Sequence, residues 1–325
     1  MSLATPRFQA TASTGVQTFT TQQRQMLHGF LLALLVSLAL WAPPGSAATH
    51  CDRDIKINNM LSNAVFTLIF RGVNGEIHNW GDVGESLTYG AGAGYLFHMS
   101  REMISAGDES RGMAAAYLAS SITENTTQGR HPLSHLRYGV GPMEVRWATP
   151  FAGGGQRLSF NLNAVDAAGM LSMMASGQAG NFSLRNGIMV GEDWGAVDPE
   201  FSAYTLNRTI VMRPEHANDQ GLWHHEMIHT TQYLQYGSFG ADSFDVVDWE
   251  QIDRFGVRNR IEKTGIDMGL RVEWFNSLMN SMDHQQDYEN RGREIEAARM
   301  AQDTSPMHDP DDHTCSAQVG FQFKF

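Results

Sequence analysis

Two histidines four residues apart, with a glutamate directly after the first, form the spacing in this chain that most clearly favours chemistry. They are His225, Glu226 and His229. Residues four apart stack on one face of a helix, so both imidazoles can bind one ion while Glu226 lies beside the remaining coordination position. A catalytic zinc needs this arrangement, because it keeps a position open for water and a carboxylate must accept the proton of that water. The pattern predicts metal-assisted hydrolysis, with His225 and His229 as zinc ligands and Glu226 as the general base.

The segments around this motif predict the elements that hold it. Residues 205–212 are rich in β-branched side chains and stop before Pro214, so we expect a strand there. Asn218 or Asp219 offers a helix cap and Gly237 a stop, which leaves room for a helix of about 17 residues. One stripe of this helix should face the metal and another the core. The two stripes are Leu222, His225, Glu226, His229, Gln232, Tyr233 and Tyr236 for the metal, and Trp223, Met227, Thr230 and Leu234 for the core.

This region resembles a family of bacterial zincin metallopeptidases. The family pattern is Ala-Phe-Thr, a strand, and His-Glu-x-x-His-x-x-Gln, followed later by Glu-x-Glu-Ala. The chain matches it with Ala203, Thr205, Gln232 and residues 294–297, and departs from it with Tyr204 in place of the phenylalanine. The resemblance covers roughly residues 200–300. It implies an α+β, zincin-like fold with a mixed sheet, in which a strand lines the cleft above the active-site helix, and it implies a protein or peptide substrate.

The third zinc ligand is predicted in the later segment. Glu294 shares a helical face with Ala297 and Ala301, and small residues let such a helix approach the histidine helix closely. Glu296 shares a face with Arg293 instead, which favours a solvated carboxylate. We therefore expect Glu294 to complete the zinc site.

Several residues remain as alternatives around this site. His224 has neither the right face nor the right spacing for a ligand, so we expect it to be a neighbour of the site. Other possible metal ligands are Glu296, Asp248, Glu250 and His284. Possible oxyanion-stabilising residues, which the sequence does not rank, are Tyr233, Tyr236, Arg291 and Arg293.

Residues 1–48 have the pattern of a signal peptide. They contain two arginines and no acidic residue, and an apolar run from Phe30 to Ala42 precedes two prolines and the small residues 46–48. The run of about 13 apolar residues is too short to cross a hydrocarbon core of roughly 30 Å as a helix. We therefore expect cleavage near residue 48 and export to the periplasm or the medium of a bacterium.

Export also bears on the cysteines and on the partners. Cys51 and Cys315 are the only cysteines, and outside the cytoplasm a disulfide between them can persist. The formal net charge is −12, and removal of the two arginines of the signal peptide changes it to −14. Such an acidic chain repels nucleic acid and anionic lipid headgroups, so we expect neither as a partner.

After the signal peptide we expect an N-terminal α+β region at 49–199, whose role the sequence does not assign. A zincin-like metal-binding catalytic region follows at 200–325, either alone or as one domain with 49–199. The elements expected in the first region are strands over 51–77 with a turn at 72–75, helices over 109–122 and 165–174, and a strand over 157–162.

The sequence thus predicts an exported zinc metallopeptidase that hydrolyses peptide bonds through a metal-activated water. One alternative is a protein that binds zinc without turnover. Another is an outer-membrane-associated protein, because apolar residues alternate up to a final phenylalanine, as in the assembly signals of outer-membrane proteins. These residues are Val319, Phe321, Phe323 and Phe325.

Overall fold

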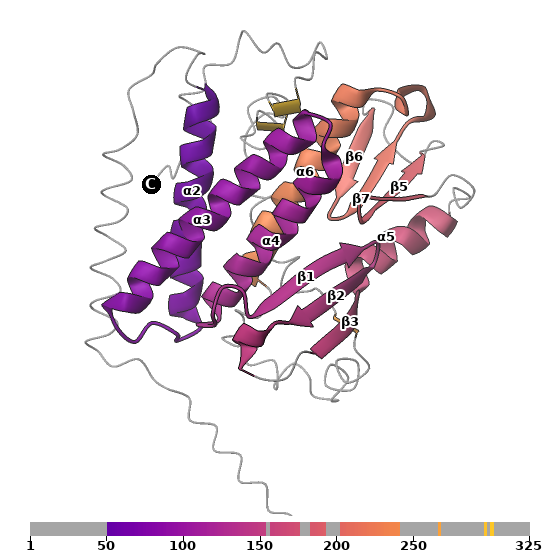
Figure 1. The fold of residues 1–325 in the computed structure, drawn as a ribbon. Coiled ribbons are helices and arrows are strands. Elements are labelled where there is room, and N and C mark those ends of the chain that lie inside the picture. The colour runs from indigo at the N-terminus through magenta and orange to yellow at the C-terminus, as the bar shows by residue number, and fades with distance from the viewer. Residues whose placement is uncertain are drawn as a thin grey trace, which may run out of the picture. The chain divides into compact units, whose positions relative to one another are not determined.

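The computed structural model describes residues 51–153, 157–175, 183–192, 202–240, 266–267, 296–297 and 300–301. The predicted signal peptide lies outside these residues. The described elements are α2 (Cys51–Val73), α3 (Trp80–Ser105), α4 (Glu109–Thr127), β1 (His135–Val140), β2 (Met143–Ala148), the 3-10 helix η2 (Pro150–Ala152), β3 (Arg157–Asn163), α5 (Ala164–Ala175), β4 (Ser183–Arg185), β5 (Ile188–Glu192), β6 (Ala203–Leu206), β7 (Thr209–Met212), the 3-10 helix η4 (Pro214–His216), α6 (Gln220–Gly240) and β8 (Ile266–Asp267). Helices and sheets together make this an α+β protein (Figure 1).

The described strands form two sheets, one with antiparallel and parallel pairs in the order β1-β2-β3-β8 and one in the order β4-β5-β7-β6. In the second sheet β5 runs parallel to β7, whereas β4 and β6 are antiparallel to their neighbours. Strands β4 and β5 precede residue 200 and strands β6 and β7 follow it, so this sheet contains strands from both of the regions predicted from the sequence. Its edge strand β6 lies against α6, which places a strand edge beside the histidine helix (Figure 1).

The segment that begins at Cys51 forms a helix, so the prediction of strands there was wrong. Every fourth residue along α2 is buried, but most of these residues are polar, and an apolar period is therefore hard to see in the sequence. They are Ile55, Asn59, Asn63, Thr67 and Arg71. Packing of α2 on α3 overrides the strand preference of its β-branched residues. The predicted turn at 72–75 is confirmed as the end of this helix, with Gly75 at a φ of 77°.

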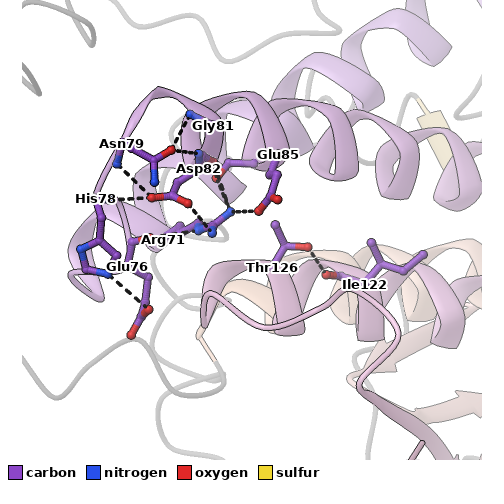
Figure 2. Close-up of polar contacts among 10 residues, drawn as sticks. Arg71, Glu76, His78, Asn79, Gly81, Asp82, Glu85, Ile122 and Thr126 are labelled. Atoms are coloured by element: carbon purple, nitrogen blue, oxygen red, sulfur yellow. Dashed lines mark hydrogen bonds and ion pairs between the residues drawn. The ribbon is translucent and has the colours of Figure 1, made fainter. Parts of the chain in front are cut away.

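Helix α3 begins with a capping box (Figure 2). The Asn79 side chain accepts hydrogen bonds from the amides of Gly81 and Asp82, and the Asp82 carboxylate accepts from the amides of His78 and Asn79. The backbone hydrogen bond from His78 is the main reason that the pKa of Asp82 lies below its usual value, against the opposing effect of burial. Arg71 of α2 donates to Asp82 at 3.3 Å, so the cap also fixes α3 to α2.

The 205–212 segment is a hairpin and not the single strand that its composition predicts. Strands β6 and β7 pair antiparallel, with Leu206 opposite Thr209. Asn207 makes the turn possible at a φ of 54°, a conformation that asparagine adopts more readily than most residues. With this turn, β6 lies antiparallel to β7 and its Thr205 side chain contacts Glu226 of α6.

Helix α6 continues past Gly237, where the sequence predicts its end. A glycine inside a helix costs about 0.5–1 kcal/mol. Full burial of a phenylalanine contributes about 1.5–3 kcal/mol, and Phe239 is 0% exposed between Phe66 and Phe70. The aromatic contact therefore outweighs the glycine.

The sheet that begins with β1 packs on α4 through charged side chains. Arg137 lies opposite Arg146 in the β1–β2 register, and both form ion pairs with Glu124 of α4, at 3.0 and 3.3 Å. Glu144 lies on the same face and binds Arg146 at 2.6 Å. Burial would raise the pKa of Glu144, but the surrounding arginines lower it to about 2.

Three predicted elements are confirmed. The helix predicted at 109–122 is α4, the helix predicted at 165–174 is α5, and the strand predicted at 157–162 is β3. The main core lies between α3, α4, the β5–β7 pair and α6, and it includes Phe97, Tyr117, Ile210, Met227 and Ile228. Among the described residues, no helix has both the length and the apolar character needed to cross a membrane.

Candidate metal and catalytic site

Helix α6 positions the motif histidines as the spacing predicts. Asp219 caps the helix by accepting the amide proton of Leu222 at 3.1 Å. The predicted core stripe is confirmed, because Trp223, Met227 and Leu234 are all buried in the main core. The opposite stripe is narrower than predicted, since Leu222 packs against that core. The polar side of the helix therefore begins at His225.

His225 and His229 direct their Nε2 atoms toward one another, 3.0 Å apart. Their rings meet edge to face, with centroids 4.7 Å apart. Two nitrogen ligands of a tetrahedral zinc at the usual Zn–N length lie about 3.3 Å apart. The donor and acceptor roles of the two rings depend on their tautomers, so the 3.0 Å contact fits either a proton or a cation between the nitrogens, and its length is close to that of a metal chelate.

Glu226 lies next to this pair on α6 and contacts the edge strand β6. Its Oε2 accepts the hydroxyl proton of Thr205 at 2.6 Å. Glu226 is only 5% exposed and His225 only 3%, so both side chains are shielded from bulk water. The carboxylate thus has a fixed direction in a mostly dry environment.

A second set of polar contacts binds His229 at Nδ1, the ring nitrogen that does not face His225. Nδ1 of His229 lies 2.8 Å from Oε1 of Gln232, and Nε2 of Gln232 donates to Oε2 of Glu296 at 2.9 Å. The other oxygen of Glu296 accepts from Asn59 of α2 at 2.7 Å and from Arg101 of α3 at 2.5 Å.

Glu296 is therefore not the solvated carboxylate that the sequence predicts. It is 7% exposed. Burial would raise its pKa, but the Arg101 charge and the hydrogen bonds from Asn59 and Gln232 together hold that pKa below the usual value. The prediction was wrong because the charge that compensates Glu296 comes from a residue far away in the sequence.

Other candidate residues lie elsewhere. His224 has its Nε2 3.8 Å from Glu109 of α4, and burial lowers the pKa of His224. Tyr236 packs against Phe70 and Phe239, while Tyr233 is half-buried on α6. The candidates that lie outside the described residues are Glu294, Asp248, Glu250, His284, Arg291 and Arg293. In the described part of the chain, no three or more His, Cys, Asp or Glu side chains gather as a metal site.

Arg101 and Asn59 are the residues of this region that sequence reasoning missed. Arg101 is 0% exposed, between Phe97 and Ile104 on one face of α3. A charged residue on an apolar helix stripe requires a buried partner, and that requirement was the available signal. The sequence offers no comparable signal for Asn59.

Helix α6 thus carries a histidine pair with a separation close to that of a metal chelate, and a shielded carboxylate that contacts strand β6. In comparisons with known proteins, no family model, no curated protein and no solved structure matches the chain.

Proposed function

We propose that this protein is an exported zinc-dependent peptidase of zincin-like architecture. The observation that carries the proposal is the pair of Nε2 atoms of His225 and His229, 3.0 Å apart, on the helix that also bears Glu226. The resemblance to zincin metallopeptidases supports a peptide substrate, and the apolar run before residue 48 supports export.

His225 and His229 would hold the zinc, with Glu294 as the proposed third ligand. Bound zinc supplies Lewis acidity, which lowers the pKa of water at the site to about 7 and polarises a carbonyl group. The protein's part is to aim both imidazoles at one point. The contact between His229 and Gln232 does this for one of the two rings.

Glu226 would accept a proton from the attacking water and return it to the leaving amine. Its Oε2 already accepts the Thr205 hydroxyl, so we assign the transferred proton to Oε1. Burial of Glu226 at 5% exposure limits competition from bulk water for the same proton.

Strand β6 would bind the substrate backbone. It is paired with β7 along one edge, and the side chains that alternate along it differ in exposure. Tyr204 and Leu206 are 39% and 43% exposed, whereas Thr205 contacts Glu226. An extended peptide added to the other edge of β6 would thus pass the general base, beside the exposed side chains of Tyr204 and Leu206.

Metal analysis and cleavage of a mixed peptide library, on the purified mature protein, test this function. We expect stoichiometric zinc and peptide hydrolysis in the wild type. Glu226→Gln should retain zinc and lose hydrolysis by a factor of about 10²–10⁴ or more, because glutamine has no basic oxygen. His225→Ala should lose both zinc and hydrolysis, because it removes a ligand.

The other outcomes separate the alternatives. Wild-type turnover by Glu226→Gln would contradict the proposed mechanism. Zinc binding without hydrolysis of any peptide would instead indicate a protein that uses the site for binding alone. Absence of zinc from the wild type would show that the histidine pair is not a metal site.

A further inference from the structure

A buried chain of polar side chains connects His229 to helices α2 and α3. It runs from His229 through Gln232 to Glu296, and from there to Arg101 and Asn59. The last four residues are each at most 7% exposed. Polar groups buried this deeply cost stability unless they are fully hydrogen-bonded.

The hydrogen-bond directions along this chain are determined at its far end. Arg101 can only donate, and its ion pair with Glu296 makes the carboxylate an acceptor. Gln232 must therefore turn its NH₂ group toward Glu296, which leaves its carbonyl oxygen facing His229. A carbonyl oxygen cannot donate, so Nδ1 of His229 is the donor in this contact, and in the neutral imidazole Nε2 then carries the lone pair.

The neighbours of Arg101 fix this arrangement further. Its Nε donates to Thr231 at 3.0 Å and its Nη2 to Gln235 at 2.5 Å, both on α6. Its Nη1 donates to Asn59 at 3.0 Å as well as to Glu296. Partners on α2 and α6 therefore hold the guanidinium of this α3 residue, and through it the carboxylate, in one orientation.

We propose that Glu296 is a positioning residue, which acts through Gln232 to fix the tautomer and ring direction of His229 so that Nε2 faces the metal position. This inference rests on the proposed function, because it assigns His229 as a zinc ligand. It gives Glu296 a role distinct from that of a ligand, since both of its oxygens are bound by Asn59, Arg101 and Gln232.

Gln232→Leu tests the proposal and keeps both members of the buried Arg101–Glu296 ion pair. Leucine keeps much of the volume but removes the amide that joins His229 to Glu296. Gln235→Leu is the matched control, because Gln235 is another buried glutamine of α6, but its side chain accepts from Arg101 instead of joining His229 to Glu296. Two measurements apply to each: ¹⁵N NMR of the His229 tautomer in zinc-free protein, and zinc affinity by chelator competition.

We expect the wild type and Gln235→Leu to show His229 protonated at Nδ1 alone. Gln232→Leu should show a mixture of tautomers and should bind zinc about 10–100-fold more weakly, the usual effect of removing a group that orients a ligand. An unchanged tautomer and affinity in Gln232→Leu would overturn the proposal. So would an equal loss in Gln235→Leu, which would indicate a general packing effect.

Glu296→Gln separates positioning from direct ligation. Its folding is checked first by circular dichroism, because it leaves the Arg101 charge uncompensated. If it folds, we expect the same 10–100-fold loss as in Gln232→Leu, since glutamine at 296 no longer dictates the direction of the Gln232 amide. Complete loss of zinc, as in His225→Ala, would make Glu296 a ligand and overturn the proposal. If it does not fold, the result for Gln232→Leu decides.

The two readouts also separate this inference from the proposed function. The tautomer is measured without zinc and without substrate, so the inference can fail or hold when no peptide is cleaved. If the wild type cleaves peptides but Gln232→Leu keeps the His229 tautomer and the zinc affinity, only the positioning role is lost.

Discussion

Thr205 of β6 donates its hydroxyl proton to Oε2 of Glu226 on α6 at 2.6 Å. The same hydroxyl oxygen lies 3.1 Å from the backbone carbonyl of Glu226, but a hydroxyl has one proton, and the charged, closer acceptor takes it. One contact thus fixes both the direction of the proposed general base and the position of the strand edge proposed to bind substrate.

Thr205→Val should lower kcat and leave the zinc content unchanged. Valine has nearly the same shape but no hydroxyl, and a hydrogen bond to a charged group contributes about 1.5–3 kcal/mol, which corresponds to about 10–100-fold in rate. Thr205→Ser keeps the hydroxyl and should retain most of the activity. The measurement is steady-state peptide cleavage together with metal analysis. Equal kcat for the valine and serine variants would remove Thr205 from the mechanism.

Gly94→Ala should destabilise the protein by about 1–3 kcal/mol, the usual cost of overpacking. A Cβ at Gly94 would lie 2.8 Å from Cα of Met60, so α2 and α3 would have to separate. Because that separation also moves Asn59, zinc affinity should fall with stability. Gly92→Ala is the control, since a Cβ there meets nothing within 4 Å. It should be neutral or slightly stabilising in urea unfolding, and equal destabilisation by both would contradict the close approach.

Glu144→Gln should destabilise the protein by about 3 kcal/mol at pH 7, because a fall in pKa from 4.5 to about 2 corresponds to this free energy. The folded state has the lower pKa, so the contribution is complete above about pH 4.5 and is lost as the pH falls toward 2. The difference between variant and wild type should therefore shrink over this range. Urea unfolding of the zinc-free protein at several pH values measures it.

A control for this prediction is Glu85→Gln, which removes an exposed partner of Arg71. Exposed ion pairs contribute about 0–1 kcal/mol, so its effect should be small at every pH. A Glu144→Gln difference that stays constant down to pH 3 would show that the Glu144 charge does not contribute to stability through its ion pairs with Arg137 and Arg146.

The sequence is informative about the histidine helix because the relevant signals are local. The cap at Asp219 and the core stripe through Met227 both depend on residues within a few turns. The predicted end at Gly237 failed because Phe239 contacts α2, which no local pattern contains. The contacts of His225 with His229 likewise follow from spacing, whereas the contact of Glu226 with Thr205 depends on a turn at Asn207.

The part of the site that could not be predicted from the sequence is the pairing of buried charges that lie far apart in the chain. Arg101 and Glu296 are separated by 195 residues, so the sequence can indicate that Arg101 needs a buried partner but not that Glu296 is that partner. The same holds for α2, whose buried face includes Asn59 and Asn63 and so lacks an apolar period. Polar burial of this kind becomes visible only when both partners have been placed.

Glu294→Ala should release zinc more completely than either Gln232→Leu or Glu296→Gln. Ala297 and Ala301 are 0% and 5% exposed in the core that contains Met227 and Ile228 of α6. Glu294 lies outside the described residues, and its helical spacing from these two alanines predicts a position on the same face, toward the histidine helix.

Removal of a ligand abolishes one metal bond, whereas loss of a positioning contact only misdirects one. Zinc affinity should therefore fall further in Glu294→Ala than the 10–100-fold loss expected for the positioning variants. Zinc retention after dialysis against a weak chelator ranks the variants. If Glu294→Ala retains zinc as the wild type does, the third ligand must be sought at Asp248, Glu250 or His284.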